Sequence, residues 1–120
     1  MRLVVLGGTR FVGRAICAAA HRRGYDVVVF NRGQSGPPPS GALAVRGDRT
    51  MISDLRQLAK MIDDRGGADL IIDPACYAPS HALMSARILK DIAPGYAVVS
   101  TVTAHRQWPA EPVESGSPIY

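Results

Sequence analysis

The residues best suited to chemistry lie near the amino terminus, in residues 7–13, which read Gly-Gly-Thr-Arg-Phe-Val-Gly. This segment follows the apolar run at residues 3–6 and precedes a stretch with helical spacing of apolar residues. Glycines at such a junction allow a tight turn and let a phosphate approach the N–H groups at a helix start. We therefore expect the turn to bind the pyrophosphate of a dinucleotide. A tight turn without a ligand is the alternative.

Asn31 and Arg32 follow a second apolar run, at residues 26–30. An acidic side chain at this position would accept hydrogen bonds from ribose hydroxyls and select NAD. Arg32 cannot accept a hydrogen bond and is suited to a 2′-phosphate. The sequence therefore favours NADP as the cofactor and keeps NAD as the alternative. A solvated loop arginine would account for Arg32 without any ligand.

Short apolar runs and helical periods alternate along the chain, and they predict the elements that position these residues. Strands are expected at residues 3–6, 26–30, 42–45, 68–73 and 96–99. The first expected helix has the apolar face Val12, Ala15, Ile16 and Ala19, and the second has Ile52, Leu55, Leu58, Ala59 and Ile62. The third has Leu83, Ala86, Ile88, Leu89 and Ile92, with Ser80 as its N-cap. Three prolines make residues 33–41 a surface loop. Such alternation predicts an α/β fold with a parallel sheet between helices on both faces.

Composition narrows the class of protein further. The 120 residues of this 12.8 kDa chain suffice for one domain. Lys and Arg number 14 against 10 Asp and Glu, which favours anionic partners, but no aromatic residues interleave the basic clusters, which argues against nucleic acid. Cys17 and Cys76 form no metal-ligand pattern, so no metal is expected. No run has the length of a signal peptide core or a membrane span, so we expect a cytoplasmic protein that does not use a membrane.

Three segments together resemble the NAD-dependent epimerase/dehydratase family of extended short-chain dehydrogenases/reductases. They are residues 6–14, residues 30–33 (Phe-Asn-Arg-Gly) and residues 47–49 (Gly-Asp-Arg). The resemblance is to an atypical branch in which Arg10 replaces the usual middle glycine, and it extends over roughly residues 1–105. It implies a Rossmann-like, doubly wound, three-layer domain with strand order 3-2-1-4-5 and the cofactor between the first and fourth strands. The cofactor-binding residues that it implies are Gly7, Gly8, Thr9, Arg10, Phe11, Val12, Gly13, Asn31, Arg32, Asp48 and Cys76.

The resemblance also implies roles for residues after the third, fourth and fifth strands. Asp48 matches an adenine-contacting aspartate, although an aspartate that supports the following helix is equally well placed. Cys76 and Tyr77 lie where the family passes the nicotinamide-side ribose, with loop packing as the alternative. Thr101, with Ser100 beside it, matches the catalytic hydroxyl position, and hydroxyls that bond the local backbone at a strand end are the alternative.

The family's Tyr-x-x-x-Lys motif is missing from this sequence. We therefore expect a truncated cofactor-binding domain at residues 1–104, followed by an irregular, proline-rich tail at 105–120, and no complete catalytic site. The substrate would be a small molecule that the sequence does not identify. A non-enzymatic NADP(H)-binding sensor or regulator, associated with RNA as some relatives are, is the second hypothesis. The fifth strand would be an open sheet edge, so we expect a homo-oligomer or a partner that completes the sheet.

Overall fold

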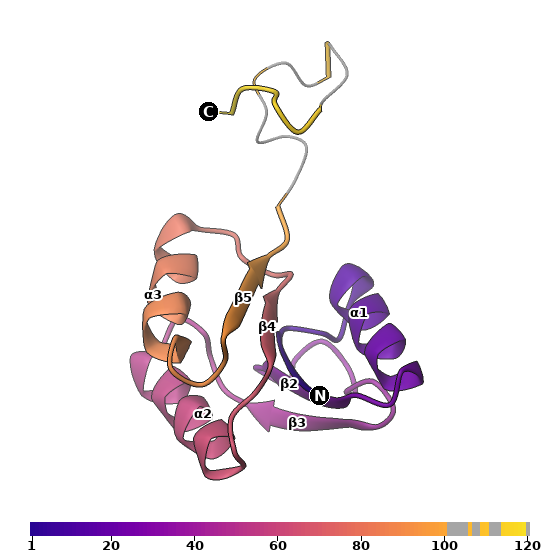
Figure 1. Ribbon diagram of the computed structural model, residues 1–120, viewed down its shortest axis with the longest axis vertical. Helices are drawn as coiled ribbons and strands as arrows, with labels where there is room; N and C mark the ends of the chain where they lie inside the picture. The colour runs from indigo at the N-terminus through magenta and orange to yellow at the C-terminus, as the bar shows by residue number, and fades with distance from the viewer. Residues whose placement is uncertain (101–105, 107–108, 111–113, 120) are drawn as a thin grey trace.

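The structure is a computed structural model, and it describes residues 1–100, 106, 109–110 and 114–119. Five parallel strands form one sheet in the order β3-β2-β1-β4-β5, which confirms the predicted topology (Figure 1). The strands are β1 (Arg2–Leu6), β2 (Asp26–Asn31), β3 (Ala42–Arg46), β4 (Leu70–Asp73) and β5 (Gly95–Val98). The strand order reverses at β1, so the carboxyl ends of β1 and β4 lie side by side where a ligand binds in such sheets.

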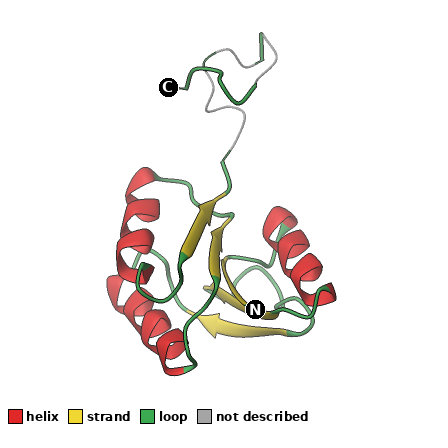
Figure 2. Ribbon diagram, in the orientation of Figure 1, coloured by secondary structure: helices red, strands yellow, loops and turns green. Residues whose placement is uncertain are grey.

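Helices cover both faces of the sheet, which makes the domain three-layered (Figure 2). Helix α1 (Phe11–Arg22) lies on one face, and α2 (Ile52–Asp64) and α3 (Pro79–Leu89) lie together on the other. Residues 32–41 connect β2 to β3 as an irregular loop, as the prolines predict. In the part of the chain that the structure describes, no helix is both long and apolar enough to cross a lipid bilayer.

The two layers of helices produce two apolar cores that share the central strands. Val4 and Leu6 of β1 point toward α2 and α3, whereas Leu3 and Val5 point toward α1. All four side chains are buried. The continuous apolar runs in the sequence are therefore explained by strands that are buried on both faces.

The buried face of helix α1 overlaps the predicted one only in part, with Ile16 partly buried against the apolar core. Its buried residues are Gly13, Cys17 and Ala20, whereas Ala15 of the predicted face is exposed. The physical reason is close contact with the turn that follows β1: a Cβ atom on Gly13 would lie 2.8 Å from the backbone nitrogen of Gly8. A face of small residues allows this approach, and a search for large apolar residues at helical spacing overlooks it.

Helix α3 also differs from the prediction at its start and on its buried face. Its N-cap is Ala78 and Pro79 is in the first turn, so the prediction of Ser80 as N-cap is wrong. Proline suits the first helical position because it has no N–H to leave unpaired and its φ is already helical. Leu83 of the predicted apolar face is 52% exposed, and the buried positions are Ser85 and Leu89. A serine therefore faces the interior, where a polar partner must satisfy it.

Strand β5 pairs with no other described strand at its outer edge, and its apolar cover by the described residues is incomplete. Val98 is 47% exposed and Val99, which follows the strand, is 39% exposed. Helix α1 packs on β1 and β2, and no described helix covers β4 and β5 on that face. Unpaired backbone groups beside exposed valines favour pairing with another chain.

We expect the 120-residue chain to self-associate through this edge, and Val99→Lys to weaken the association by about fivefold or more, because a charge beside an open edge disfavours strand pairing. Sedimentation velocity over a concentration series measures the effect. Leu83→Lys is the matched control, since it places the same charge at an exposed leucine on α3 and should leave the association unchanged. A monodisperse monomer at every concentration would contradict the prediction.

Candidate functional site

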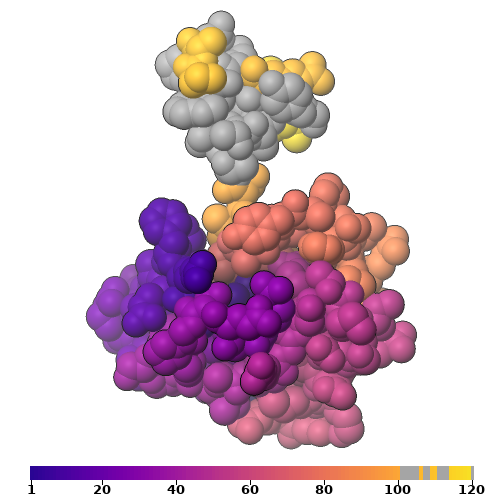
Figure 3. All heavy atoms as spheres, turned by 180° about the vertical axis from the view of Figure 1, so that it is seen from behind, coloured from indigo at the N-terminus to yellow at the C-terminus, as the bar shows by residue number. Residues whose placement is uncertain are grey.

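A cavity of about 590 Å³ opens at the carboxyl ends of the strands. Figure 3 shows the hollow between the indigo segment that begins α1 and the salmon-coloured segment that begins α3. Four segments supply its lining residues: Leu6, Gly7, Gly8, Thr9, Arg10, Phe11, Val12 and Gly13; Phe30, Asn31, Arg32, Gln34 and Ser35; Gly47, Asp48, Arg49 and Thr50; and Pro74, Ala75, Tyr77 and His81. All the candidate cofactor-binding residues except Cys76 therefore line one cavity.

The glycines of the turn between β1 and α1 are required by the backbone and by its neighbours. Gly7 has a φ of +121° and Gly8 a φ of +92°, a region that side chains disfavour. A Cβ atom on Gly8 would lie 2.8 Å from Val29 Cγ1 and 3.0 Å from Cys17 Sγ. Gly8 thus brings the turn close to β2 and α1.

The N-terminus of α1 faces this cavity without an acidic residue in its first turn, and no described side chain caps it. The first N–H groups of a helix have no partner within the helix, and with the helix dipole they attract anions. Arg10 adds an exposed cation immediately before the helix. The next residue, Phe11, has a φ of +40° and a side chain that is 90% exposed.

Asn31 ties the glycine turn to the loop that carries Arg32. Its side-chain nitrogen donates to the carbonyl of Gly7 at 3.3 Å, and its side-chain oxygen accepts from the N–H of Gly33 at 2.7 Å. Arg32 between them is exposed at the cavity wall. The asparagine therefore helps to fix the shape of the cavity, and the exposed guanidinium of Arg32 can bind an anion there.

Asp48 supports its own loop and lines the cavity, and no described side chain caps the following helix α2. Its Oδ1 atom accepts from the N–H of Thr50 at 2.8 Å and from the hydroxyl of Thr50 at 2.7 Å. These hydrogen bonds, with smaller effects of the Arg32 and His81 charges, lower the pKa of Asp48 below its usual range. The group is therefore a carboxylate at neutral pH, able to accept hydrogen bonds from a ligand.

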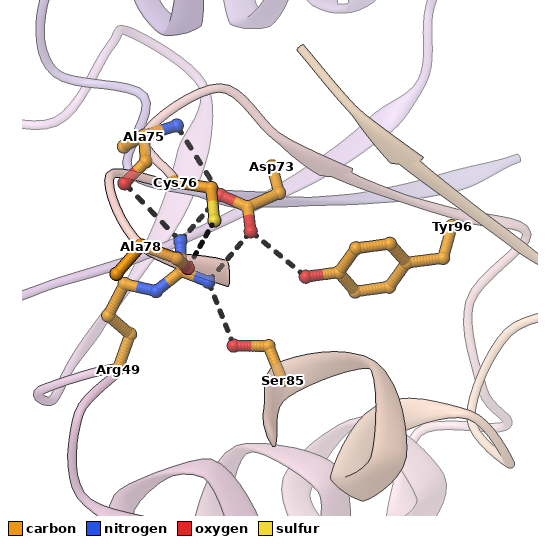
Figure 4. Close-up of polar contacts among 7 residues, drawn as sticks. All are labelled: Arg49, Asp73, Ala75, Cys76, Ala78, Ser85 and Tyr96. Atoms are coloured by element: carbon orange, nitrogen blue, oxygen red, sulfur yellow. Dashed lines mark hydrogen bonds and ion pairs between the residues drawn. The ribbon is translucent and has the colours of Figure 1, made fainter. Parts of the chain in front are cut away.

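Beside the cavity lies a buried polar network that the sequence did not predict (Figure 4). Asp73 at the end of β4 is 0% exposed, and its two oxygens accept from Arg49 Nη1 and Nη2 at 2.6 and 2.7 Å. Arg49 Nη2 also donates to Ser85 Oγ at 3.0 Å, and the Tyr96 hydroxyl donates to Asp73 Oδ2 at 3.0 Å. An aspartate that ends an apolar strand and a serine on an apolar helix face were the available signals.

The electrostatics of this network keep its groups in fixed protonation states. Burial alone would lower the pKa of Arg49, but the hydrogen bonds and charge of Asp73 outweigh it and raise the pKa, so the guanidinium stays charged. Burial, and secondly the charge of Asp73, raise the pKa of the Tyr96 hydroxyl well above its usual range. Tyr96 therefore remains a protonated hydrogen-bond donor.

The remaining candidates lie at the margin of the cavity or outside it. Cys76 is partly buried, and its Sγ contacts the carbonyl oxygen of Ala78 at 3.3 Å instead of lining the cavity. Tyr77 lines the cavity with a side chain that is 92% exposed. Ser100 is exposed just beyond β5, and Thr101 lies outside the residues that the structure describes.

Solved structures share this fold. WbmG from Bordetella bronchiseptica in complex with NAD aligns with a TM-score of 0.77 at 16% identity, over 100% of this chain and 44% of that one. A short-chain dehydrogenase/reductase from Burkholderia multivorans with bound NADP aligns with a TM-score of 0.76 at 17% identity, over 92% of this chain and 63% of that one. The chain thus spans about half to two thirds of their length, and identities this low show the fold.

A sequence comparison identifies the family where the structural likeness cannot. No curated protein matches the sequence. The model of the NAD dependent epimerase/dehydratase family, however, matches residues 3–100. Apart from Arg2 at the start of β1, that segment includes the five strands, the three helices and every described residue that lines the cavity. The chain therefore belongs to the NAD dependent epimerase/dehydratase family.

Proposed function

We propose that this chain binds a nicotinamide dinucleotide in the cavity at the carboxyl ends of β1 and β4. The observation that carries the proposal is the uncapped N-terminus of α1, which opens into a cavity of about 590 Å³ directly after a turn of glycines. Family membership supports the same ligand class. When bound, such a dinucleotide accepts or donates a hydride at its nicotinamide ring.

The chain's own residues would hold the two ends of the ligand differently. The backbone N–H groups at the start of α1, together with Arg10, would bind the pyrophosphate, since both favour negative charge. Thr9, Phe11 and Val12 would line the same part of the cavity. Asp48 would accept hydrogen bonds at the adenosine end of the ligand. The nearby charges of Arg32 and His81 favour its carboxylate form.

We propose NADP as the preferred cofactor, with NAD as the alternative. Arg32 is exposed at the cavity wall and follows β2, where an acidic residue would otherwise bind the ribose hydroxyls. A guanidinium matches the geometry and the charge of a 2′-phosphate.

The catalytic contribution of this chain is proposed to be partial. Ser100 and Thr101 would supply hydroxyls near a substrate carbonyl or alcohol, beyond the carboxyl end of β5. The sequence contains no Tyr-x-x-x-Lys, the motif that would hold the proton-transferring tyrosinate. The chain would therefore bind the cofactor of an epimerase, dehydratase or reductase, and it would not catalyse the reaction by itself. The same missing motif supports the second candidate function, a non-enzymatic NADP(H)-binding sensor or regulator.

We expect Arg32→Ala to abolish a preference for NADPH over NADH. A hydrogen bond between charged groups contributes about 1.5–3 kcal/mol, or about 10- to 150-fold in affinity. Calorimetric titration of both nucleotides measures the ratio of their Kd values before and after the substitution. Arg56→Ala, at an exposed arginine on α2, is the control and should leave the ratio unchanged. Equal affinities for the two nucleotides in the unchanged chain would contradict the assignment to NADP.

We expect Gly13→Val to abolish dinucleotide binding, because the new side chain would meet the backbone of Gly8 and push the helix away from the turn. Overpacking of this kind also destabilises a fold by about 1–3 kcal/mol. Circular dichroism confirms that the variant is folded, and fluorescence titration with NADPH measures binding. Ala15→Val on the exposed side of the same helix is the control. A folded Gly13→Val variant with unchanged affinity would show that the turn does not bind the ligand.

A further inference from the structure

The function proposed above assigns no role to the buried network of Arg49, Asp73, Ser85 and Tyr96, although Arg49 also lines the cavity. Asp73 cannot serve a ligand, because each of its oxygens already accepts two hydrogen bonds. Oδ1 accepts from Arg49 Nη1 and from the N–H of Ala75, at 2.6 and 3.3 Å. Oδ2 accepts from Arg49 Nη2 and from the Tyr96 hydroxyl, at 2.7 and 3.0 Å. The role of the network must therefore lie in what it connects.

The ion pair joins segments that the sheet itself keeps apart. Arg49 lies between β3 and α2, and Asp73 ends β4, so β2 and β1 lie between the two strands concerned. The described residues form two further ion pairs, and neither connects distant parts of the sheet. Arg2 and Asp26 pair on the neighbouring strands β1 and β2, and Lys60 and Asp64 pair within α2.

From this ion pair, contacts lead directly to the walls of the cavity. Asp73 Oδ1 accepts from the N–H of Ala75, and Arg49 Nη1 donates to the carbonyl of Ala75 at 3.4 Å. Ala75 and Pro74 in turn lie against the glycine turn. A Cβ atom on Gly7 would be 3.3 Å from Ala75 Cβ, and one on Gly13 would be 3.2 Å from Pro74 Cγ.

The opposite wall depends on the same arginine. Asp48 and Thr50, the neighbours of Arg49 in sequence, both line the cavity. Their loop is further held by the N–H of Asp48, which donates to Asp54 Oδ2 at 2.8 Å, and by the hydrogen bonds between Thr50 and Asp48. Arg49 thus fixes how far this loop stands from Pro74, Ala75 and the turn behind them.

Stability alone does not call for an ion pair at this place. Burying two charges costs free energy that their attraction barely returns, and apolar side chains of similar volume often stabilise a fold as well or better. Arg49 Nε is buried and has no hydrogen-bond partner among the described residues, which adds a further cost. What apolar side chains cannot supply is direction, because a bidentate pair fixes both the distance and the orientation of its two segments.

We propose that the Arg49–Asp73 pair is the positioning device of the cavity: it holds the loop at Asp48 and the segment at Ala75 at the separation that a bound dinucleotide requires. This inference rests on the proposed function for its ligand. Arg49 and Asp73 are positioning residues and touch no reacting atom. Tyr96 and Ser85 complete the device by occupying the remaining hydrogen-bonding positions of the pair.

The test separates positioning from stability by replacing the network with apolar side chains. Asp73→Leu alone leaves Arg49 buried without its partner, so both unfolding stability in urea and NADPH affinity should fall strongly. The triple variant Arg49→Met, Asp73→Leu and Tyr96→Phe should recover the urea midpoint. Its NADPH affinity should nevertheless stay at least about tenfold below that of the unchanged chain, because an apolar cluster does not fix the two loops. Recovery of affinity together with stability would overturn the proposal.

A second measurement needs no ligand. Amide hydrogen exchange at Gly7, Asp48 and Ala75, whose N–H groups are hydrogen-bonded, should be at least about tenfold faster in the triple variant. Exchange in the core of β1 and β2 should be unchanged, since local opening is reported residue by residue. Unchanged exchange at all three sites would overturn the proposal. Should the unchanged chain bind neither NADPH nor NADH, the proposed function fails, and the exchange rates still decide whether the pair positions the loops.

Two further variants keep the test decisive if the triple variant does not fold. Arg49→Lys retains the charge but makes a single-point contact, so it should show the same faster exchange at Asp48 and Ala75. If Arg49→Lys matches the unchanged chain in exchange and affinity, the proposal is wrong. The control is Lys60→Gln with Asp64→Asn, which removes an exposed ion pair on α2 and should change neither exchange at the three sites nor affinity.

Discussion

The close approach of α1 to the end of β1 is the constraint on which the rest of the structure depends. A side chain at Gly8 would meet β2 and α1, and a side chain at Gly13 would meet the backbone of Gly8. Strand, turn and helix can therefore pack only with glycine at both positions. This packing directs the free N–H groups of α1 toward the carboxyl ends of the strands, and it leaves room there for Pro74 and Ala75 to form the facing wall.

A second constraint operates beneath that wall, where charge replaces close packing. Strands β2 and β3 lie on one side of β1, and β4 and β5 lie on the other. A polar network of Arg49, Asp73, Ser85 and Tyr96 joins these two halves of the sheet on the side of α2 and α3. The domain thus uses small residues where backbone segments touch and a directional ion pair where loops must stay apart. Together they give a cavity with one wall fixed by glycine contacts and the other by hydrogen bonds.

The sequence predicts the sheet well and the polar interior poorly, for physical reasons. Runs such as residues 26–30 are apolar throughout because their strands are buried on both faces, so strand order and layers follow from pattern and connection rules. The glycine turn could also be predicted, because its residues are contiguous in the sequence. The buried face of α1 cannot be predicted from large apolar residues, because Gly13, Cys17 and Ala20 are small. The Arg49–Asp73 pair cannot be predicted from sequence patterns, because its members are 24 residues apart and meet only in the folded chain.

Phe11 shows what such a scaffold implies for recognition. Its φ of +40° is unfavourable for an aromatic residue by about 1–3 kcal/mol, and its ring is 90% exposed, so no burial of its own offsets that cost. A strained residue of this kind persists only where the surrounding structure fixes it, so the fold of the domain holds the turn in this conformation. The entropy of ordering this turn is consequently lost in folding and not in association. A ligand therefore meets a preorganised turn, and a larger share of its contact energy appears as affinity.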